Sequence, residues 1–268
     1  MTGERLSSLT LCLRPTTPIE ESRRREPLGP YLQGFLMEHI DSGYASYLHQ
    51  LPFNPYSQYC RWDKDELVWR VSALTREAGE RILVPLRSVD VVELRAAGMA
   101  LEVTRSSQET IGLKSIADKV AEPCGRKVRV RFVTPTSFKS AGDYVIMPSV
   151  RLVVQNLLMH YGQVYEDNKE GYAETVEYVD RQVRVTSYDL RSNYFGNVGG
   201  GRRLPAFTGR MTLDLRGPQM AVGLVRMLLA FGEFSGVGIK TSMGMGGLVV
   251  QQTGADPRPG SVADVAQQ

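Results

Sequence analysis

Residues 236–247 read Gly-Val-Gly-Ile-Lys-Thr-Ser-Met-Gly-Met-Gly-Gly, and the C-terminal half of the chain is organised around them. Glycine accepts positive φ and lets a backbone approach a ligand closely, because it has no Cβ. Such a loop can offer a row of backbone N–H donors to phosphate oxygens, with Lys240 placed among them. We therefore expect an anion-binding loop. The alternative is a tight connection whose glycines only permit close packing.

The elements that flank this loop argue against the common nucleotide-binding loops. Residues 218–231 are predicted to form a helix that ends at Gly232, and residues 248–250 a short strand. A P-loop and a dinucleotide-binding loop both need a strand before the loop and a helix after it. The order here is reversed, so neither interpretation holds.

Working outward from the loop, the two halves of the chain show the same predicted order of elements. Alternating apolar and polar residues indicate strands, and apolar residues at helical spacing indicate helices. In the first half we predict strands at 6–13, 56–62, 66–74, 89–95 and 100–104, helices at 30–41 and 76–86, and a short helical turn at 44–49. In the second half we predict strands at 127–133, 182–190, 205–215 and 248–250, and helices at 150–161 and 218–231.

This order predicts an α+β fold of two tandem ferredoxin-like (RRM-like) βαββαβ domains. We place the first domain at residues 1–122 and the second at 123–252, with the boundary in the weakly patterned stretch 105–125. Within the second domain, residues 166–180 are acidic and expected to be exposed, and residues 199–203 are expected to form a mobile loop. Residues 253–268 are polar and predicted to be a disordered tail.

Composition limits the class of protein. The 268 residues are 42% hydrophobic and 23% charged, with a net charge of +3, as in a soluble globular protein whose overall charge does not demand a nucleic-acid partner. Cys12, Cys60 and Cys124 have neither CxxC nor metal-ligand spacing, which favours a reducing compartment. No signal-like or membrane-spanning apolar run is present. We expect a cytoplasmic protein without membrane contact, metal or cofactor.

The distribution of basic residues is more informative than their sum. Lys127, Arg129 and Arg131 alternate with apolar residues and so share one face of the predicted strand 127–133. The same half also carries Lys139, Arg202, Arg203, Arg210 and Lys240. RRM-like folds bind RNA on a sheet face, so these residues are candidate RNA ligands. A solvated charged face is the alternative.

Only three histidines occur, and they are the candidate acid–base groups. His160 falls among helical apolar positions, which favours a structural role. His49 lies where the short helical turn gives way to a proline-rich loop, with Tyr44 and Tyr47 nearby; catalytic groups often occupy such loops. His39 lies in the first helix. Neither HExxH nor GxSxG occurs, and the carboxylates do not cluster, which disfavours a metal-dependent hydrolase.

Four motifs occur in order between residues 31 and 250: Tyr31-Leu-Gln-Gly34, Tyr47-Leu-His49, Thr134-Pro-Thr-Ser-Phe138 and the glycine-rich loop. With these motifs the chain resembles the CRISPR-associated endoribonucleases that process precursor CRISPR RNA, members of the RAMP superfamily. The resemblance implies two ferredoxin-like domains and metal-independent cleavage within CRISPR repeat RNA to generate guide RNAs. In that reaction the ribose 2′-OH attacks the adjacent phosphate, leaving a 2′,3′-cyclic phosphate and a 5′-OH.

The resemblance also implies roles for individual residues. His49, by its match to the family's Tyr-Leu-His, is the first catalytic candidate, and His39 is the second. Met37 aligns where relatives can carry a tyrosine, and no lysine follows His49, so the group that stabilises charge is left open among Tyr44, Tyr47 and Lys240. RNA positioning is expected from the basic residues above and from the loop residues Gly236, Gly238, Lys240, Thr241, Ser242, Gly244 and Gly246.

The partner implied by the resemblance is CRISPR repeat RNA. The resemblance also allows CRISPR effector-complex subunits and a second copy of the chain as partners. Two other classes of function stay open from the residues. A non-catalytic RNA-binding RAMP subunit of an effector complex would use the same loop without needing His49. A ferredoxin-like metabolic enzyme would have a small-molecule pocket and no salt-sensitive affinity for RNA.

Overall fold

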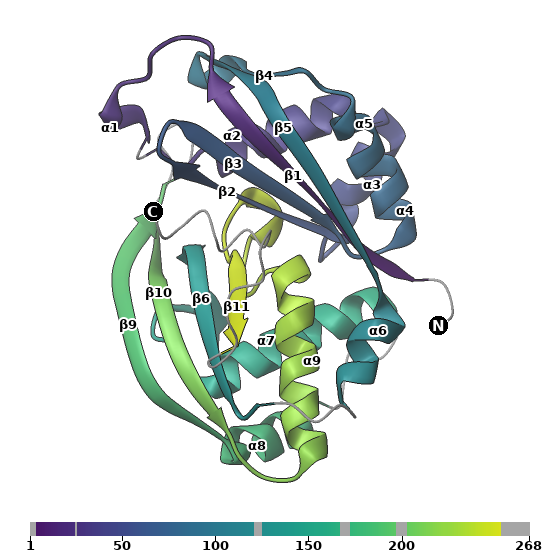
Figure 1. Cartoon of the computed structure of the whole chain (residues 1–268), viewed down its shortest axis with the longest axis vertical. Helices are drawn as coiled ribbons and strands as arrows, with labels where there is room; N and C mark the ends of the chain where they lie inside the picture. Colours follow the sequence, from purple (N-terminus) through teal and green to yellow (C-terminus); the bar gives the residue numbers. More distant parts are fainter. Residues whose placement is uncertain (1–3, 25, 121–124, 167–171, 197–202, 253–268) are drawn as a thin grey trace.

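Two antiparallel sheets form the body of the protein (Figure 1), and the computed structural model describes residues 4–24, 26–120, 125–166, 172–196 and 203–252. The predicted tail, most of the predicted loop 199–203, Arg202 and Cys124 lie outside these residues. The strands of the first sheet come from residues 5–112, and those of the second from residues 127–252. No helix in the described part of the chain is long and apolar enough to span a membrane.

The first sheet has the strand order β2-β3-β1-β5-β4. Its strands are β1 (Arg5–Pro15), β2 (Tyr56–Asp63), β3 (Glu66–Ala73), β4 (Val91–Leu94) and β5 (Met99–Gly112). The predicted strand at 100–104 was too short, because β5 stays paired with β1 as far as Gly112. β4, which was predicted as the strand at 89–95, pairs with β5 and adds an edge strand to the βαββαβ unit of the first half.

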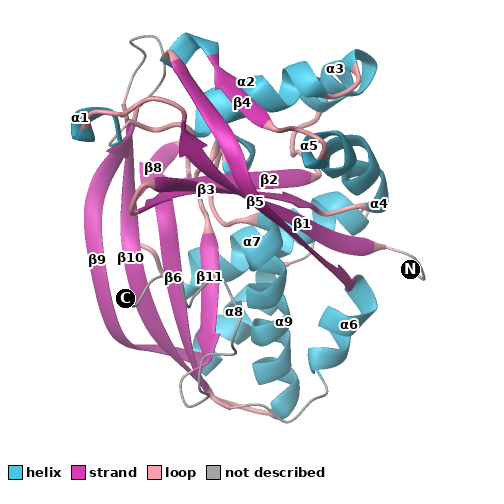
Figure 2. Ribbon diagram, turned by 45° about the horizontal axis from the view of Figure 1, so that its top comes forward, coloured by secondary structure: helices cyan, strands magenta, loops and turns pink. Residues whose placement is uncertain are grey.

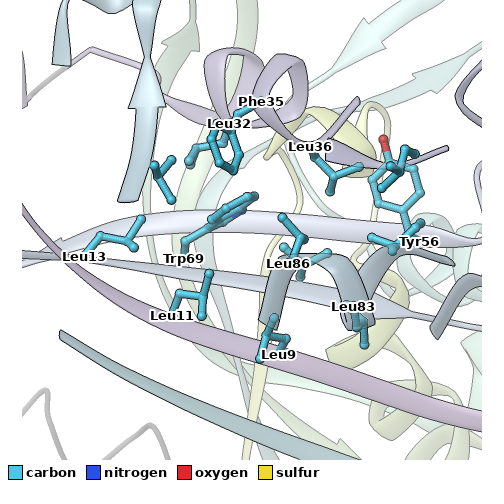
Figure 3. Packing of buried hydrophobic residues seen from close by; sticks show 14 of the residues in the cluster. Leu9, Leu11, Leu13, Leu32, Phe35, Leu36, Tyr56, Trp69, Leu83 and Leu86 are labelled. Atoms are coloured by element: carbon cyan, nitrogen blue, oxygen red, sulfur yellow. The ribbon is translucent and has the colours of Figure 1, made fainter. Parts of the chain in front are cut away.

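Helices cover one face of the first sheet. They are α2 (Gly29–His39), α3 (Ser42–Gln50), α4 (Arg76–Ala78), a π-helical turn (Gly79–Leu83) and α5 (Val84–Arg87), preceded by the short α1 (Glu21–Arg24). The side chain of Asp41 caps α3 by accepting from the N–H of Tyr44, and α3 runs for nine residues where we predicted only a short turn. Leu32, Phe35 and Leu36 of α2 face Trp69 of β3 in the first core (Figure 3). This packing fixes the helices that carry the two candidate histidines.

The second sheet has the strand order β11-β6-β10-β9. Its strands are β6 (Lys127–Thr136), β9 (Val183–Phe195), β10 (Leu204–Leu215) and β11 (Leu248–Gln252), beside a small hairpin of β7 (Phe138–Ser140) and β8 (Asp143–Val145). Helices α7 (Val150–Tyr165), α8 (Ala173–Gln182) and α9 (Gln219–Ser235) pack on one face. In a ferredoxin-like unit the first strand lies between the third and the last. Here β1 lies between β3 and β5, and β6 lies between β10 and β11, so the predicted tandem fold is confirmed.

The two halves meet along α9 (Figure 2), after a connection through α6 (Leu113–Ala117) and a 3₁₀ turn (Asp118–Val120). Phe231 and Phe234 of α9 join a cluster with Leu6 and Leu74 of the first half. The hydroxyl of Ser57 on β2 donates to the carbonyl oxygen of Phe234. One helix therefore contributes to the second core and to the junction between the sheets.

One predicted helix end was wrong, and one segment expected to be exposed has two buried residues. Gly232 does not end α9, which continues to Ser235 and ends at Gly236 with φ of 67°. Gly232 is instead a packing position, because a Cβ there would lie 2.8 Å from a Leu248 methyl group. Within the stretch 166–180, expected to be exposed, α8 forms because Val176 and Val179 are buried in the second core.

Candidate active site and glycine-rich loop

The glycine-rich loop leaves α9 and folds against the first half of the chain before β11 begins (yellow in Figure 1). Thr241–Met243 form a 3₁₀ turn that contacts β2 and the start of α2. Lys240 precedes this turn, is exposed, and has a left-handed backbone with φ of 56°. The exposed charge of the loop is therefore the Lys240 ammonium group.

Most backbone N–H groups of the loop are already occupied by acceptors inside the protein. The residues whose N–H donates in this way are Gly236, Val237, Gly238, Ile239, Met243, Met245, Gly246 and Gly247. The expected row of bare donors is therefore wrong for this part of the loop. Gly238 has φ of 88°, and a Cβ there would lie 2.4 Å from the carbonyl oxygen of Ser137. Close packing, the alternative interpretation, explains these glycines.

His49 lies in the last turn of α3 and is exposed to solvent. It is followed by the loop 51–55, which leads into β2. Asn54 in that loop donates from Nδ2 to Ser242 Oγ of the glycine-rich loop, at 3.4 Å. The segment after His49 and the segment after Lys240 are thus in direct contact, although they are far apart in the sequence.

His39 is exposed at the end of α2, and its ring is held by two contacts. The imidazole stacks on Phe35 with ring centroids 3.8 Å apart, and Nδ1 lies 2.8 Å from the Phe35 carbonyl oxygen. Because a carbonyl can only accept, Nδ1 carries the proton and Nε2 is left as the outward nitrogen. His49 lies at the far end of α3, a rise of roughly 12 Å from the N-cap Asp41. The two histidines are separate candidates rather than a contacting pair.

The candidate tyrosines point away from His49. Tyr44 is buried in the first core, with the Arg81 guanidinium 5.1 Å from its ring centroid. Burial raises the pKa of Tyr44 to about 12. Five residues of α-helix place Tyr44 and His49 roughly 140° apart around α3. Tyr47 is half exposed, with its ring centroid 5.9 Å from that of Tyr44. The structure therefore groups the tyrosines with each other.

The basic strand has the predicted alternation. Lys127, Arg129 and Arg131 are exposed on β6, while the alternate residues are buried. The register places Arg131 directly opposite Arg210 of β10, which is itself paired with Asp189 of β9 at 3.5 Å. Lys139 and Arg203 are also exposed, on β7 and immediately before β10. The open face of the second sheet is thus the main basic surface among the described candidates.

Sequence reasoning missed several polar residues that contact the glycine-rich loop, among them Asn54, Gln58 and Asn156. Gln58 is 1% exposed and hydrogen-bonds the carbonyl oxygen of Ser242. The available signal was an amide inside a strand with aromatic neighbours, Tyr56-Ser-Gln-Tyr59. A buried amide needs partners, but the sequence alone does not say which.

The comparisons with known proteins agree on one family. Residues 130–248 match the family model described as CRISPR-associated endoribonuclease Cas6. A CRISPR-associated endoribonuclease Cas6 of Mycobacterium tuberculosis is 42% identical over 252 residues, covering 92% of this chain and 79% of the relative. One of Streptococcus thermophilus is 35% identical, covering 85% of this chain and 93% of the relative.

The chain belongs to the Cas6 family.

Solved Cas6 structures show the same fold. A Cas6 product complex aligns with a TM-score of 0.72 at 24% identity, covering 92% of this chain and 100% of that one. A Thermus thermophilus Cas6 aligns with a TM-score of 0.69 at 21% identity, covering 94% and 100%. As a Cas6-family member the chain is an endoribonuclease, and the alternatives of a non-catalytic RNA-binding subunit and a metabolic enzyme are set aside.

Proposed function

We propose that this Cas6-family chain cleaves within CRISPR repeat RNA without a metal ion, and that His49 is a catalytic residue. The observation that carries the proposal is the contact between Asn54 and Ser242. It holds the loop after His49 against the loop that presents Lys240. A proton-transfer group and a cation are thereby presented from two adjoining segments.

The reaction needs one proton removed and one supplied. A base takes the proton of the ribose 2′-OH, and the 2′-oxygen attacks the adjacent phosphorus. The bond between phosphorus and the 5′-oxygen breaks, and the leaving oxygen takes up a proton. The products are a 2′,3′-cyclic phosphate and a 5′-OH, so no water is consumed. An imidazole can perform either transfer near neutral pH, typically with about a 10²- to 10⁴-fold effect.

Lys240 is our candidate for stabilising the transition state. The attacked phosphate gains negative charge on its non-bridging oxygens, and a cation held near it is most useful at that moment. Lys240 is exposed, and its Nζ lies 3.7 Å from Met243 Sδ. None of the described contacts of Lys240 is with a carboxylate, so its charge is not neutralised by one of them. Tyr44 is less suited to this role, because its phenol lies in the first core.

His39 is the second candidate, and one specific observation favours it. Its Nδ1 contact with Phe35 sets the tautomer that presents Nε2 as a proton acceptor. His49 has no equivalent contact in the described structure. His49 remains our first candidate because it matches the family motif and because the loop that follows it contacts the glycine-rich loop.

RNA is the partner we infer for the basic face of the second sheet. Lys127, Arg129 and Arg131 follow one another along β6 at intervals of about 6.6 Å, the rise of two strand residues. This spacing suits contacts to successive phosphates. CRISPR effector-complex subunits and a second copy of the chain stay as proposed partners. They would be detected by co-purification and by sedimentation of the free protein.

The experiment that tests the reaction uses synthetic cognate repeat RNA in excess EDTA. We expect wild-type protein to cut at one position and to leave a 2′,3′-cyclic phosphate and a 5′-OH, identified by mass spectrometry. A substrate with a single 2′-deoxyribose at that position should bind but resist cleavage. Two results would contradict the proposed mechanism. One is cleavage that EDTA abolishes and added Mg²⁺ restores, and the other is cleavage of the deoxy substrate.

A further inference from the structure

We propose that Gln58 is a positioning residue for the cleavage reaction, locking the glycine-rich loop to the helix pair that carries the candidate histidines. This inference rests on the proposed function. Gln58 lies on β2 and is 1% exposed, so it is too deeply buried to contact RNA itself. Its role would therefore be to fix other segments relative to each other.

The side-chain amide of Gln58 joins three segments that are distant in the sequence. Nε2 donates to the carbonyl oxygen of Gly29, at 3.1 Å, and to that of Ser242, at 2.9 Å. Oε1 accepts from the indole N–H of Trp69, at 2.6 Å. Gly29 begins α2, Ser242 lies in the glycine-rich loop, and Trp69 is fully buried on β3.

The Trp69 contact fixes which way the amide points. An indole N–H can only donate, so it selects Oε1, and Nε2 must then face the two carbonyl oxygens. An amide supplies one acceptor and two donors in this geometry, and all three are used. No apolar side chain or carboxylate of similar size can satisfy the same set. The position therefore requires glutamine chemically, and not merely a side chain of that volume.

Ser242 extends the lock to the loop that follows His49. Its hydroxyl accepts a hydrogen bond from Asn54 Nδ2 at 3.4 Å, and the hydroxyl of Tyr56 lies close enough to interact with it. Burial raises the pKa of Tyr56 to about 12, so that hydroxyl stays protonated. One residue of the glycine-rich loop thus connects to the segment after His49 and, through Gln58, to the start of α2. Ser242, which we predicted to bind RNA, is largely occupied by these contacts.

The test compares Gln58→Leu with Ser57→Ala. Ser57 is the neighbouring residue on β2 and also bonds across the junction, but to α9 rather than to the glycine-rich loop. For Gln58→Leu we expect the single-turnover cleavage rate at saturating repeat RNA to fall about 10- to 100-fold. The dissociation constant for the 2′-deoxy substrate should change by less than about twofold. Ser57→Ala should cut at the wild-type rate.

Two further readouts separate positioning from loss of folding. The carboxyl group of a Gln58→Glu variant would face two carbonyl oxygens in a buried site, which favours its protonated form, and only that form can donate. The Gln58 partners are two carbonyls and an indole, none of which titrates between about pH 5 and 9. The rate of Gln58→Glu relative to wild type should therefore rise as the pH falls. In hydrogen exchange, Gln58→Leu should accelerate the amides of Met243, Met245 and Gly246, and Ser57→Ala should not.

Each outcome decides the proposal. Wild-type cleavage by Gln58→Leu, or equal losses in Gln58→Leu and Ser57→Ala, would overturn it. If Gln58→Leu does not fold, the cleavage rate of Gln58→Glu relative to wild type decides. A relative rate that does not change with pH would overturn the proposal, and one that rises as the pH falls supports it. If wild-type protein does not cut RNA at all, the proposed function fails. Hydrogen exchange would then still show whether Gln58 locks the loop.

Discussion

The backbones of Gly29 and Gly244 touch at the junction between the two halves of the chain. A Cβ on Gly244 would lie 2.9 Å from the Gly29 Cα, and a Cβ on Gly29 would lie 2.3 Å from the Met243 carbonyl oxygen. Gly244 also has φ of 98°, which disfavours any side chain. The start of α2 and the glycine-rich loop can pack this closely only because both positions lack a side chain.

Substitution of Gly244 by alanine should therefore damage stability and cleavage together. We expect the free energy of unfolding to fall by about 1–3 kcal/mol, from backbone strain and the clash with Gly29. Urea denaturation measures this change. Gly34→Ala is the matched control, because Gly34 is an exposed glycine of α2 with nothing near its Cβ position. The control should gain up to about 1 kcal/mol and keep its activity. Equal behaviour of the two variants would contradict the packing account.

Lys240→Gly should separate stability from activity. The left-handed backbone at Lys240 costs a residue with a side chain about 1 kcal/mol, and glycine removes that cost. The free energy of unfolding should rise by about that amount, while the cleavage rate falls because the cation is lost. Thermal unfolding and single-turnover cleavage measure the two effects. An unchanged cleavage rate would remove Lys240 from the reaction.

Arg131 lies opposite Arg210, and two like charges in register across strands repel each other. We expect Arg131→Gln to fold at least as stably as wild type but to bind repeat RNA more weakly. The plot of log affinity against log salt concentration should lose about one unit of slope or slightly less. Arg181→Gln is the control, since Arg181 pairs with Glu177 on α8. Identical salt slopes for the two variants would argue against RNA on this face.

His160 should make stability fall as the pH falls. It is buried beside Phe53, and burial lowers its pKa from 6.5 to about 4, an effect that the backbone of Gly236 and Gly238 only partly offsets. Below about pH 6.5 the unfolded chain takes up a proton that the folded chain does not, so stability present at pH 7 is lost towards pH 4. The loss from this group is about 2 kcal/mol between pH 7 and pH 5.

Urea denaturation of wild type and His160→Gln at both pH values tests that prediction. His160→Gln should lose less stability than wild type on going from pH 7 to pH 5, whatever its stability at pH 7. Equal losses would mean that His160 is already charged in the fold.

Periodicity predicted most of the fold. The alternation on β6, the hairpin of β2 and β3 and the helices α2 and α7 are local patterns, and each was placed within a few residues. The errors came from tertiary packing. Gly232 stays helical because Leu157 and Leu248 pack against it, and β5 extends to Gly112 because β1 supplies a partner, although its own pattern is weak. Neither cause is visible in the local sequence.

The candidate site was less predictable. His49 and Lys240 could be singled out by residue type and motif, but the sequence could not show that Asn54 and Ser242 join their segments. It also suggested phosphate ligation by loop N–H groups that the fold uses internally, because their acceptors lie within the loop and on the elements that pack around it, among them β6, α7 and α9. Contacts between distant segments decide such questions, and spacing does not encode them.

The most direct test of this account is the cleavage of cognate repeat RNA in EDTA by wild type, His49→Ala and His39→Ala, with binding of the 2′-deoxy substrate measured in parallel. We predict that His49→Ala binds as tightly as wild type but cuts about 10²- to 10⁴-fold more slowly. His39→Ala should retain most of its rate. Cleavage by His49→Ala at the wild-type rate, above all with His39→Ala inactive, would contradict the assignment of His49.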